Sequence, residues 1–404
     1  MSFLAKLLKR AFRRAPLAPL QFPSSGFDVI SDAVKLEEEQ LDGFNAAKYY
    51  PVRIGDVYSS KYQVLGKLGY GTTSTVWLAR NLEDHQYVAL KVFTRGVDGG
   101  ELDTYHRLGT ANPSNPGYRH VRRALDTLEL QREGGPHLCL VQKPMWDSWK
   151  DMLRRNPTGR FTEEFLKAGL AQLFLALDYL HTECRLVHTD LKADNILQEL
   201  VDDSVLEAFV QAELATPSPR KFIQDAPVYR SRQFDLPHKF GDVVLSDFSA
   251  AVQGDKKRNH DAQPNVYRSP EVMLMTEWGY PVDVWNVGVM IWDLFEGRHL
   301  FQGSDPDGRP YTTRAHLAEV IGMLGPPPLD FVQREIRSKE FFTEHGEWKV
   351  DIPVPEGRGL DDAVTSLEGE KRTLFLVFLR SMLQWRPEDR KTASQLLQDP
   401  WLRS

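Results

Sequence analysis

The sequence contains few cysteines and no long apolar run. Two of its 404 residues are cysteine, which excludes the disulfide frameworks of small secreted domains and favours a reducing compartment. The best apolar stretch, residues 284–295, is interrupted by Asn286 and Asp293 and is too short to cross a bilayer. Since 41% of the residues are hydrophobic, a chain of this length can bury a large core.

Acidic residues are missing from the first 27 positions, which contain five basic residues. The formal net charge of −6 for the whole chain therefore leaves −11 for residues 28–404. An acidic body repels nucleic acid and attracts basic partners, so we expect no direct nucleic-acid binding. Solubility alone is an alternative reason for this charge.

The same N-terminal segment (1–27) has an amphipathic pattern that Pro16 and Pro19 end. One helical face holds Phe3, Leu4, Leu7, Leu8, Ala11 and Phe12, and the other holds Lys6, Lys9, Arg10, Arg13 and Arg14. Three interpretations stay open: a mitochondrial presequence within residues 1–20, a membrane-surface helix, or a basic tail. We expect membrane contact only through residues 1–14, and a cytoplasmic or nuclear protein if the segment is a tail.

Periodicity divides the rest of the chain into a strand-rich part and a helical part. Alternating β-branched and aromatic residues predict strands at residues 62–68, 75–80, 87–93 and 138–142. Apolar spacing predicts a core helix over residues 166–180 and a buried helix over 284–295. We expect an α+β fold with an N-terminal extension (28–61), a small β-rich lobe (62–143) and a larger helical lobe (144–404). Irregular stretches, two of them insertions in the larger lobe, are expected at about 198–240, 252–266 and 325–370.

A glycine-rich turn, Gly-Tyr-Gly-Thr-Thr-Ser-Thr-Val at residues 69–76, joins the first two strands. Glycine lets a turn bring backbone N–H groups close to phosphate oxygens. A dinucleotide-binding loop would lead into a helix, whereas residues 74–80 are strand-like. The pattern favours a hairpin that covers phosphates, and a purely structural hairpin is the alternative.

A lysine, Lys91, ends the apolar strand that precedes it. A buried ammonium needs a partner, and a nucleotide phosphate together with a helix carboxylate would supply one. Glu101 is the favoured partner and Asp103 is its rival. Alternatively, Lys91 reaches solvent at the end of its strand.

Two polar motifs follow the core helix. The first, His-Thr-Asp-Leu-Lys-Ala-Asp-Asn at residues 188–195, supplies a carboxylate that can accept a hydroxyl proton, a lysine for a phosphoryl group and an amide oxygen for a metal ion. The second, Ser-Asp-Phe-Ser at residues 246–249, supplies a carboxylate that suits Mg²⁺. The order of all four elements is far more specific than any one of them.

In this order the motifs resemble the signature set of eukaryotic protein kinases, with residues 269–271 (Ser-Pro-Glu) in place of Ala-Pro-Glu. More narrowly, the chain resembles the SR-protein-kinase family, and especially its fungal-type members. Four features carry that likeness: Thr189 before the catalytic aspartate, the segment Tyr50–Val57, the glycine-loop sequence, and 51 residues between Asn195 and Asp247.

The resemblance implies a two-lobed kinase fold, ATP and Mg²⁺ as cofactors, and transfer of the γ-phosphate to serine or threonine of a protein substrate. It further implies a basic, serine-containing substrate, as in Arg/Ser-rich segments. Asp190 would be the catalytic base, Lys192 would steady the γ-phosphate, and Asn195 and Asp247 would hold Mg²⁺. ATP would be bound by Leu68, Gly69, Tyr70, Gly71, Thr72, Thr73, Ser74, Thr75, Val76, Lys91, Glu101, Lys143 and Met145.

The resemblance also implies two contacts in the helical lobe. Glu271 would pair with Arg390, and Asp283 would bind the backbone of the catalytic loop. For Asp283, a helix N-cap just after Pro281 is an equal alternative.

A pseudokinase scaffold is the alternative function. Pseudokinases usually lack one of the phosphate- or metal-binding groups, and all of them are present here: Lys91, Asp190, Asn195 and Asp247. The departures from the usual pattern, such as Gln142, Ser249 and Pro264, remove none of these groups and bear on the rate.

No serine, threonine or tyrosine occurs in residues 250–266. Many kinases order this segment with a phosphate that pairs with an arginine beside the catalytic aspartate, and Thr189 stands in that arginine's place. Both halves of the switch are missing, so we expect activity without phosphorylation of residues 249–271. The segment's own basic residues, 256–258, could pair with carboxylates such as Asp255 or Asp261, and the sequence does not assign those pairs.

Overall fold

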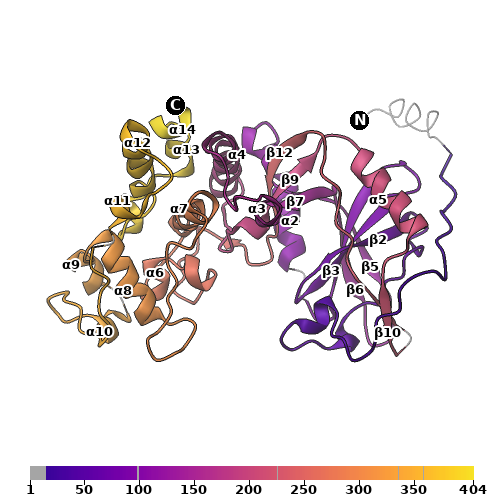
Figure 1. Ribbon diagram of the computed structural model, residues 1–404, viewed down its shortest axis with the longest axis horizontal. Helices are drawn as coiled ribbons and strands as arrows, with labels where there is room; N and C mark the ends of the chain where they lie inside the picture. The colour runs from indigo at the N-terminus through magenta and orange to yellow at the C-terminus, as the bar shows by residue number, and fades with distance from the viewer. Residues whose placement is uncertain (1–14, 98–99, 225, 335, 358) are drawn as a thin grey trace. The chain divides into compact units, whose positions relative to one another are not determined.

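The computed structural model describes residues 15–97, 100–224, 226–334, 336–357 and 359–404; the amphipathic residues 1–14 lie outside them. Within the described residues, no helix is both long and apolar enough to cross a membrane. The chain forms two compact units, shown in Figure 1. The strand-rich unit holds the described residues up to Leu102, Arg123–Trp146 and Glu199–Gly241, and the helical unit holds Asp103–Arg122, Asp147–Gln198 and Asp242–Ser404.

The strand-rich unit is built on a six-stranded antiparallel sheet in the order β1–β2–β3–β4–β6–β5. Its strands are β1 (Val57–Tyr58), β2 (Tyr62–Tyr70), β3 (Ser74–Asn81), β4 (Tyr87–Phe93), β5 (Ala124–Leu130) and β6 (His137–Gln142). Alternate side chains, among them Val64, Trp77 and Leu90, pack in one buried cluster, as the pleat of a strand requires. The four strands predicted in this region are confirmed.

The described residues of Glu199–Gly241 belong to the strand-rich unit, whereas the sequence placed residues 198–240 in the helical lobe as an irregular insertion. They contain α5 (Ser204–Ala215) and the hairpin of β10 (Arg220–Ile223) and β11 (Ala226–Tyr229), seen with the sheet in Figure 1. A Cβ at Gly66 of β2 would lie 2.6 Å from the buried ring of Phe209, so glycine there lets α5 approach the sheet. These elements are too short to give a strong periodic signal.

The N-terminal extension packs on the same sheet and contains the 3-10 helices η1 (Glu37–Gln40) and η2 (Ala46–Lys48). Lys67 of β2 is fully buried, with its Nζ 2.8 Å from Glu37 and 2.5 Å from Glu38. A buried ammonium is tolerated only with such partners, so the extension and β2 depend on each other.

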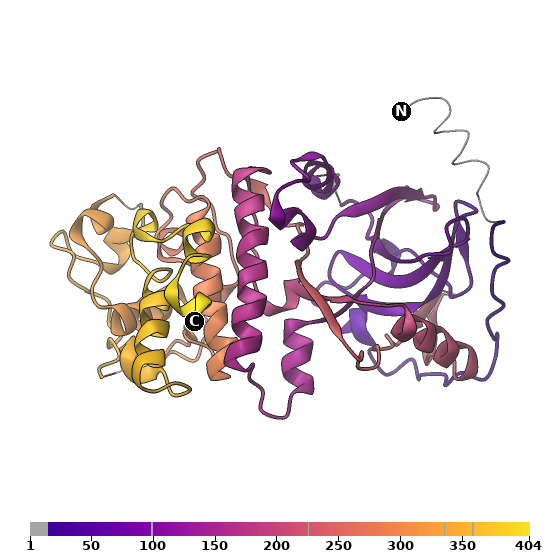
Figure 2. The same ribbon diagram turned by 90° about the horizontal axis from the view of Figure 1, so that it is seen from above.

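The helical unit is built around α4 and α7, which run alongside each other in Figure 2. They confirm the two predicted helices. The helices that lie wholly in this unit are α3 (Trp149–Arg155), α4 (Glu163–Thr182), α6 (Pro270–Met273), α7 (Pro281–Glu296), α8 (Thr313–Leu324), α9 (Leu329–Gln333), α10 (Ser338–Phe341), α11 (Leu360–Ala363), α12 (Gly369–Arg380), α13 (Ala393–Leu396) and α14 (Pro400–Arg403). Short 3-10 helices are η3 (Pro116–His120), η4 (Ala193–Asn195), η5 (Asn265–Tyr267) and η6 (Pro387–Asp389). The stretch at about 325–370 is therefore only partly irregular, since it contains α9, α10 and α11.

Short strands frame the polar motifs. β7 (Met145–Ser148), β9 (Ile196–Leu200) and β12 (Phe240–Leu245) form a sheet in the order β12–β9–β7, and β8 (Leu186–Val187) pairs with β13 (Val252–Gln253). Residues 188–195 thus connect β8 to β9, and residues 246–249 connect β12 to β13. The remaining helix, α2 (Gly100–Thr110), carries Glu101 near its start.

Candidate functional site

The glycine-rich turn is a hairpin and leads into a strand, as predicted. Leu68–Tyr70 end β2, Gly71–Thr73 form the turn and Ser74–Val76 begin β3. A Cβ at Gly69 would meet no described atom within 4 Å, and one at Gly71 would meet only the Ser74 carbonyl oxygen at 3.9 Å. The chain's own packing does not require these glycines, so the bare backbone fits a ligand that approaches it closely.

Lys91 of β4 pairs with Glu101 of α2, with Nζ 2.7 Å from Oε1. Their side chains are only 11% and 6% exposed, so the partner predicted for this lysine is confirmed. An ammonium carries three donors, and a carboxylate on one side leaves it able to hold phosphate oxygens.

Two more of the predicted ATP-binding residues, Lys143 and Met145, lie just after strand β6. Lys143 follows β6, is exposed and forms an ion pair with Glu199, while Met145 begins β7 and is buried. Just before them, Gln142 is 2% exposed and its Nε2 has no hydrogen-bond partner within the described chain. An unpaired buried amide is costly, which makes Gln142 a group that a ligand would satisfy.

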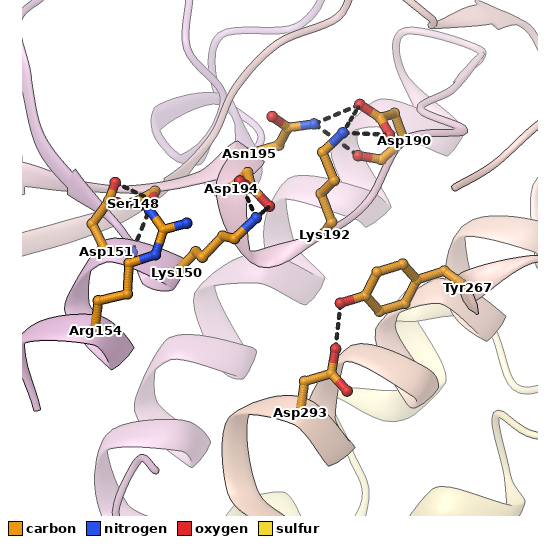
Figure 3. A network of polar contacts seen from close by, with 10 residues as sticks. All are labelled: Ser148, Lys150, Asp151, Arg154, Asp190, Lys192, Asp194, Asn195, Tyr267 and Asp293. Carbon is orange, nitrogen blue, oxygen red and sulfur yellow. Dashed lines mark hydrogen bonds and ion pairs between the residues drawn. The ribbon is translucent and has the colours of Figure 1, made fainter. Parts of the chain in front are cut away.

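Asp190, Lys192 and Asn195 form one polar cluster between β8 and β9, shown in Figure 3. Lys192 Nζ lies 3.0 and 2.9 Å from the two carboxylate oxygens of Asp190. The Asn195 amide nitrogen donates to the Asp190 carbonyl oxygen at 2.8 Å and to its Oδ2 at 2.9 Å. Because the amide nitrogen of Asn195 makes both bonds, its amide oxygen points away from Asp190, where it can coordinate a cation.

Asp283 of α7 holds the backbone of this loop. Its Oδ2 accepts from the His188 N–H at 2.8 Å and its Oδ1 from the Thr189 N–H at 2.9 Å. Tyr280 is the N-cap residue of α7, and no side-chain cap hydrogen bond is found there among the described residues. The backbone-binding interpretation of Asp283 is confirmed and the N-cap interpretation is wrong.

Asp247 lies close to Asn195 through the backbone, because the Ser246 N–H donates to the Asn195 carbonyl at 2.8 Å. Its φ of 60° is in a region that residues other than glycine rarely adopt, and such strain clusters at functional sites. The next residue, Phe248, is fully buried and packs edge-on against Tyr105 of α2 at 5.7 Å between ring centroids. This packing fixes the direction of the Asp-Phe motif.

A half-buried arginine, Arg122, that no sequence motif indicated lies beside these groups. The Arg122 N–H donates to the Leu245 carbonyl at 2.8 Å, and its guanidinium lies 3.4 Å from the Ser246 hydroxyl. Burial lowers the pKa of Arg122, and the nearby Tyr105 and Asp247 oppose that shift. A charged residue just before a strand is ordinary, so no sequence pattern distinguished Arg122.

A cavity of about 460 Å³ opens beside Asp190 in the helical unit. Its wall includes Lys192 on one side and His260, Asp261 and Trp278 on the other. The Trp278 indole donates to the His260 carbonyl at 2.9 Å, which holds this wall in place. The cavity is large enough for side chains of a peptide next to the Asp190 carboxylate.

Glu271 and Arg390 form the predicted pair within the helical unit. Both side chains are fully buried, with nitrogen–oxygen distances of 2.6 and 2.7 Å in a bidentate arrangement. Such planar pairs are among the strongest hydrogen-bonded contacts.

All predicted ATP-binding residues fall in the strand-rich unit, whereas Asp190, Lys192, Asn195 and Asp247 fall in the helical unit. The structure brings together Lys91 with Glu101 in the first unit, and Lys192 and Asn195 with Asp190 in the second. Their roles toward nucleotide and metal stay predictions.

Comparison with known proteins gives the family. The protein kinase domain family matches residues 62–402. A serine/threonine protein kinase of Aspergillus fumigatus is 41% identical over 401 residues, covering 98% of each chain. The serine/threonine-protein kinase SRPK of Physarum polycephalum is 29% identical over 92% of each chain, and SRSF protein kinase 3 of Mus musculus is 24% identical over 91% of each chain. With the kinase motifs in order on a β-rich and a helical unit, the chain belongs to the protein kinase family and is a serine/threonine protein kinase similar to the SR-protein kinases.

Proposed function

We propose that this serine/threonine kinase uses Mg-ATP to phosphorylate serine in basic, Arg/Ser-rich protein segments. The observation that carries the proposal is the cluster around Asp190, in which Lys192 and Asn195 each place a nitrogen within 3.0 Å of Asp190 oxygens. This cluster borders the cavity of the helical unit, where a substrate hydroxyl would reach the carboxylate.

In this proposal each residue of the cluster has one task. Asp190 accepts the proton of the substrate hydroxyl, which makes the oxygen a better nucleophile. Lys192 lies against that carboxylate and balances negative charge on the phosphoryl group in transit. Asn195 orients Asp190 through its amide nitrogen.

Protein kinases use ATP and a divalent metal, and the residues present fit both. The open backbone at Gly69 and Gly71 and the paired Lys91 suit phosphates. Asn195 and Asp247 offer the hard oxygen ligands that Mg²⁺ prefers. When bound, the metal supplies positive charge that neutralises the phosphate oxygens.

The pseudokinase alternative has less support. Lys91 keeps its carboxylate partner, and Asp190 is held by two neighbours in the loop that Asp283 supports. A scaffold would have no need to keep this arrangement.

Two observations support a basic substrate. Residues 28–404 carry a formal charge of −11, because the first 27 residues contribute +5 to a total of −6. The names of two relatives, an SRPK and an SRSF protein kinase, connect them with SR proteins. Carboxylates at the cavity, Asp190 and Asp261, would attract arginine side chains.

The test is phosphorylation by the purified protein of three peptide sets: Arg-Ser repeats, Lys-Ser repeats and neutral serine peptides. We expect the Arg-Ser set to have the highest kcat/KM and an apparent KM that rises with salt, since ionic screening weakens attraction beyond about 8–10 Å. Equal use of all three sets would contradict the substrate class and leave the kinase activity standing.

Two variants test the roles of the site. Asp190→Ala should lose about 10²–10⁴-fold in kcat with ATP affinity nearly kept, whereas Asp351→Ala, which removes an exposed carboxylate, should behave as the parent. Asp247→Asn should weaken stabilisation by Mg-ATP in a thermal-shift titration. Full activity of Asp190→Ala would refute the catalytic assignment.

A further inference from the structure

We propose that Tyr49, in the N-terminal extension, positions the glycine-rich hairpin for the phosphates of ATP. Its hydroxyl lies 3.1 Å from the carbonyl oxygen of Gly71 and 3.3 Å from that of Thr72. The role rests on the proposed binding of ATP by this hairpin. Tyr49 acts through the backbone and is a positioning residue, not a catalytic one.

The contact fixes which way the turn presents its N–H groups. Within a trans peptide, the C=O and the N–H point to opposite sides. The carbonyls of Gly71 and Thr72 face Tyr49, and the carbonyl of Thr73 accepts from the Thr94 N–H at 2.8 Å. The N–H groups of these three peptide planes therefore face away from those partners. Consecutive N–H groups turned to one side make a site for phosphate oxygens.

Tyr49 can hold the hairpin because it is itself held by the sheet. Its carbonyl oxygen accepts from the Arg132 guanidinium, and the carbonyl of the preceding Lys48 accepts from the Arg95 N–H at 2.8 Å. Its ring packs against Phe44 with centroids 5.3 Å apart. Burial raises the pKa of the Tyr49 hydroxyl, so it stays a donor at neutral pH.

The same extension also holds the stem of the hairpin. Lys67, directly before Leu68 on β2, is fully buried between Glu37, Glu38 and the Tyr229 carbonyl, which lies 3.0 Å from its Nζ. The stem is thus fixed by buried charge and the tip by one hydroxyl. Removing the hydroxyl should free the tip and leave the fold in place.

The test compares Tyr49→Phe with Tyr50→Phe. The control removes the next hydroxyl along, which makes no hydrogen bond seen in the described chain, and it keeps the ring contacts with Tyr58 and His137. The expected loss of nucleotide affinity corresponds to the contribution of one hydrogen bond. For Tyr49→Phe we expect KM for ATP and the dissociation constant of ADP to rise about threefold to tenfold. The affinity for adenosine, kcat at saturating ATP and the unfolding temperature without nucleotide should stay near the parent values.

Each outcome of this comparison either supports or overturns the positioning role of Tyr49. The adenosine arm separates phosphate positioning from general damage, because adenosine has no phosphate for the hairpin to bind. An active parent with an unchanged KM in Tyr49→Phe would overturn the role, and so would equal weakening of ADP and adenosine or the same loss in Tyr50→Phe. A parent that does not bind ATP would refute the proposed function, and this role with it.

Discussion

The hydroxyl of Thr189 donates a hydrogen bond of 2.9 Å to the carbonyl oxygen of Ala250. Thr189 stands directly before Asp190, the proposed catalytic base, and Ala250 begins the segment that many kinases order by phosphorylation. The φ of Thr189 is 68°, which is costly for a β-branched residue. Its N–H bond to Asp283 compensates for that strain. A neutral hydrogen bond thus joins the two places that an arginine and a phosphate would otherwise join.

Three charged residues of the segment, Asp255, Lys257 and Asp261, also have partners that the sequence analysis did not assign. Asp255 accepts from the Tyr280 hydroxyl at 3.0 Å, and Asp261 pairs with Arg268 at 3.2 Å. Lys257 pairs with Glu277 at 2.6 Å. The segment is held by contacts within the helical unit that need no modification.

Phosphatase treatment should therefore leave the activity of the purified kinase unchanged within about twofold, because nothing between Ala250 and Val266 can carry a phosphate ester. Activity toward the best peptide is measured before and after treatment, with intact mass to verify the phosphate content. A large loss that maps to residues 249–271 and returns on rephosphorylation would contradict this prediction.

Thr189→Val should lower kcat/KM about tenfold, because it keeps the shape of the side chain and leaves the Ala250 carbonyl without its donor. A lost hydrogen bond to a part-buried carbonyl costs about 1–3 kcal/mol, and 1.4 kcal/mol corresponds to a factor of about ten. Thr373→Val is the matched control, since its hydroxyl bonds only within the exposed surface of α12. Equal kcat/KM for the two variants would show that the Thr189 bond does not order the segment.

The parts of the site that residue patterns alone predicted have local contacts, whereas the long-range contacts of Asp283 and Glu271 were expected from the family resemblance. The glycine hairpin closes between Gly71 and Ser74, and the catalytic cluster spans Asp190 to Asn195. Because such motifs have short spacing and fixed residue types, they can be identified from the sequence alone. The positions of strands and helices could be predicted for a similar reason, because they follow the local period of hydrophobic residues.

What the sequence did not predict depends on contacts between distant segments. Tyr49 meets Gly71 across 22 positions, and Arg122 meets Ser246 across 124. Helix α5 has 12 residues, and its place on the sheet depends on the missing side chain of Gly66. No periodic pattern records such pairings.

Arg390→Met should lower the free energy of unfolding by about 3–5 kcal/mol, because it leaves the fully buried carboxylate of Glu271 without its partner. Urea unfolding of the purified variant measures the loss. Adding Glu271→Leu to Arg390→Met should recover part of it, since both charges are then gone. Arg334→Met, which breaks an exposed pair with Glu388, should change stability little. No recovery in the double variant would show that the loss comes from packing.

The last prediction concerns His316 of α8, which is fully buried. Its Nδ1 lies 3.1 Å from the Tyr311 hydroxyl, and its ring packs against Phe301. Burial, helped by the positive charge of nearby Arg268, lowers the pKa of His316 to about 3. An unfolded histidine has a pKa of about 6.5, so the unfolded chain takes up a proton between these values and the folded chain does not.

The contribution of neutral His316 to the free energy of unfolding should therefore be fully present above about pH 6.5 and be lost as the pH drops toward 3. From about pH 7.5 to about pH 5, this one group should lower the free energy of unfolding by roughly 2 kcal/mol. His316→Gln cannot titrate, so its urea-unfolding free energy should fall less than the parent's by that amount, whatever its stability at neutral pH. His345→Gln, which replaces an exposed histidine, should keep the parent's pH dependence. Parallel pH profiles for the parent and His316→Gln would mean that His316 has the same pKa in the folded and unfolded chains, which its burial among Tyr311, Phe301 and Arg268 opposes.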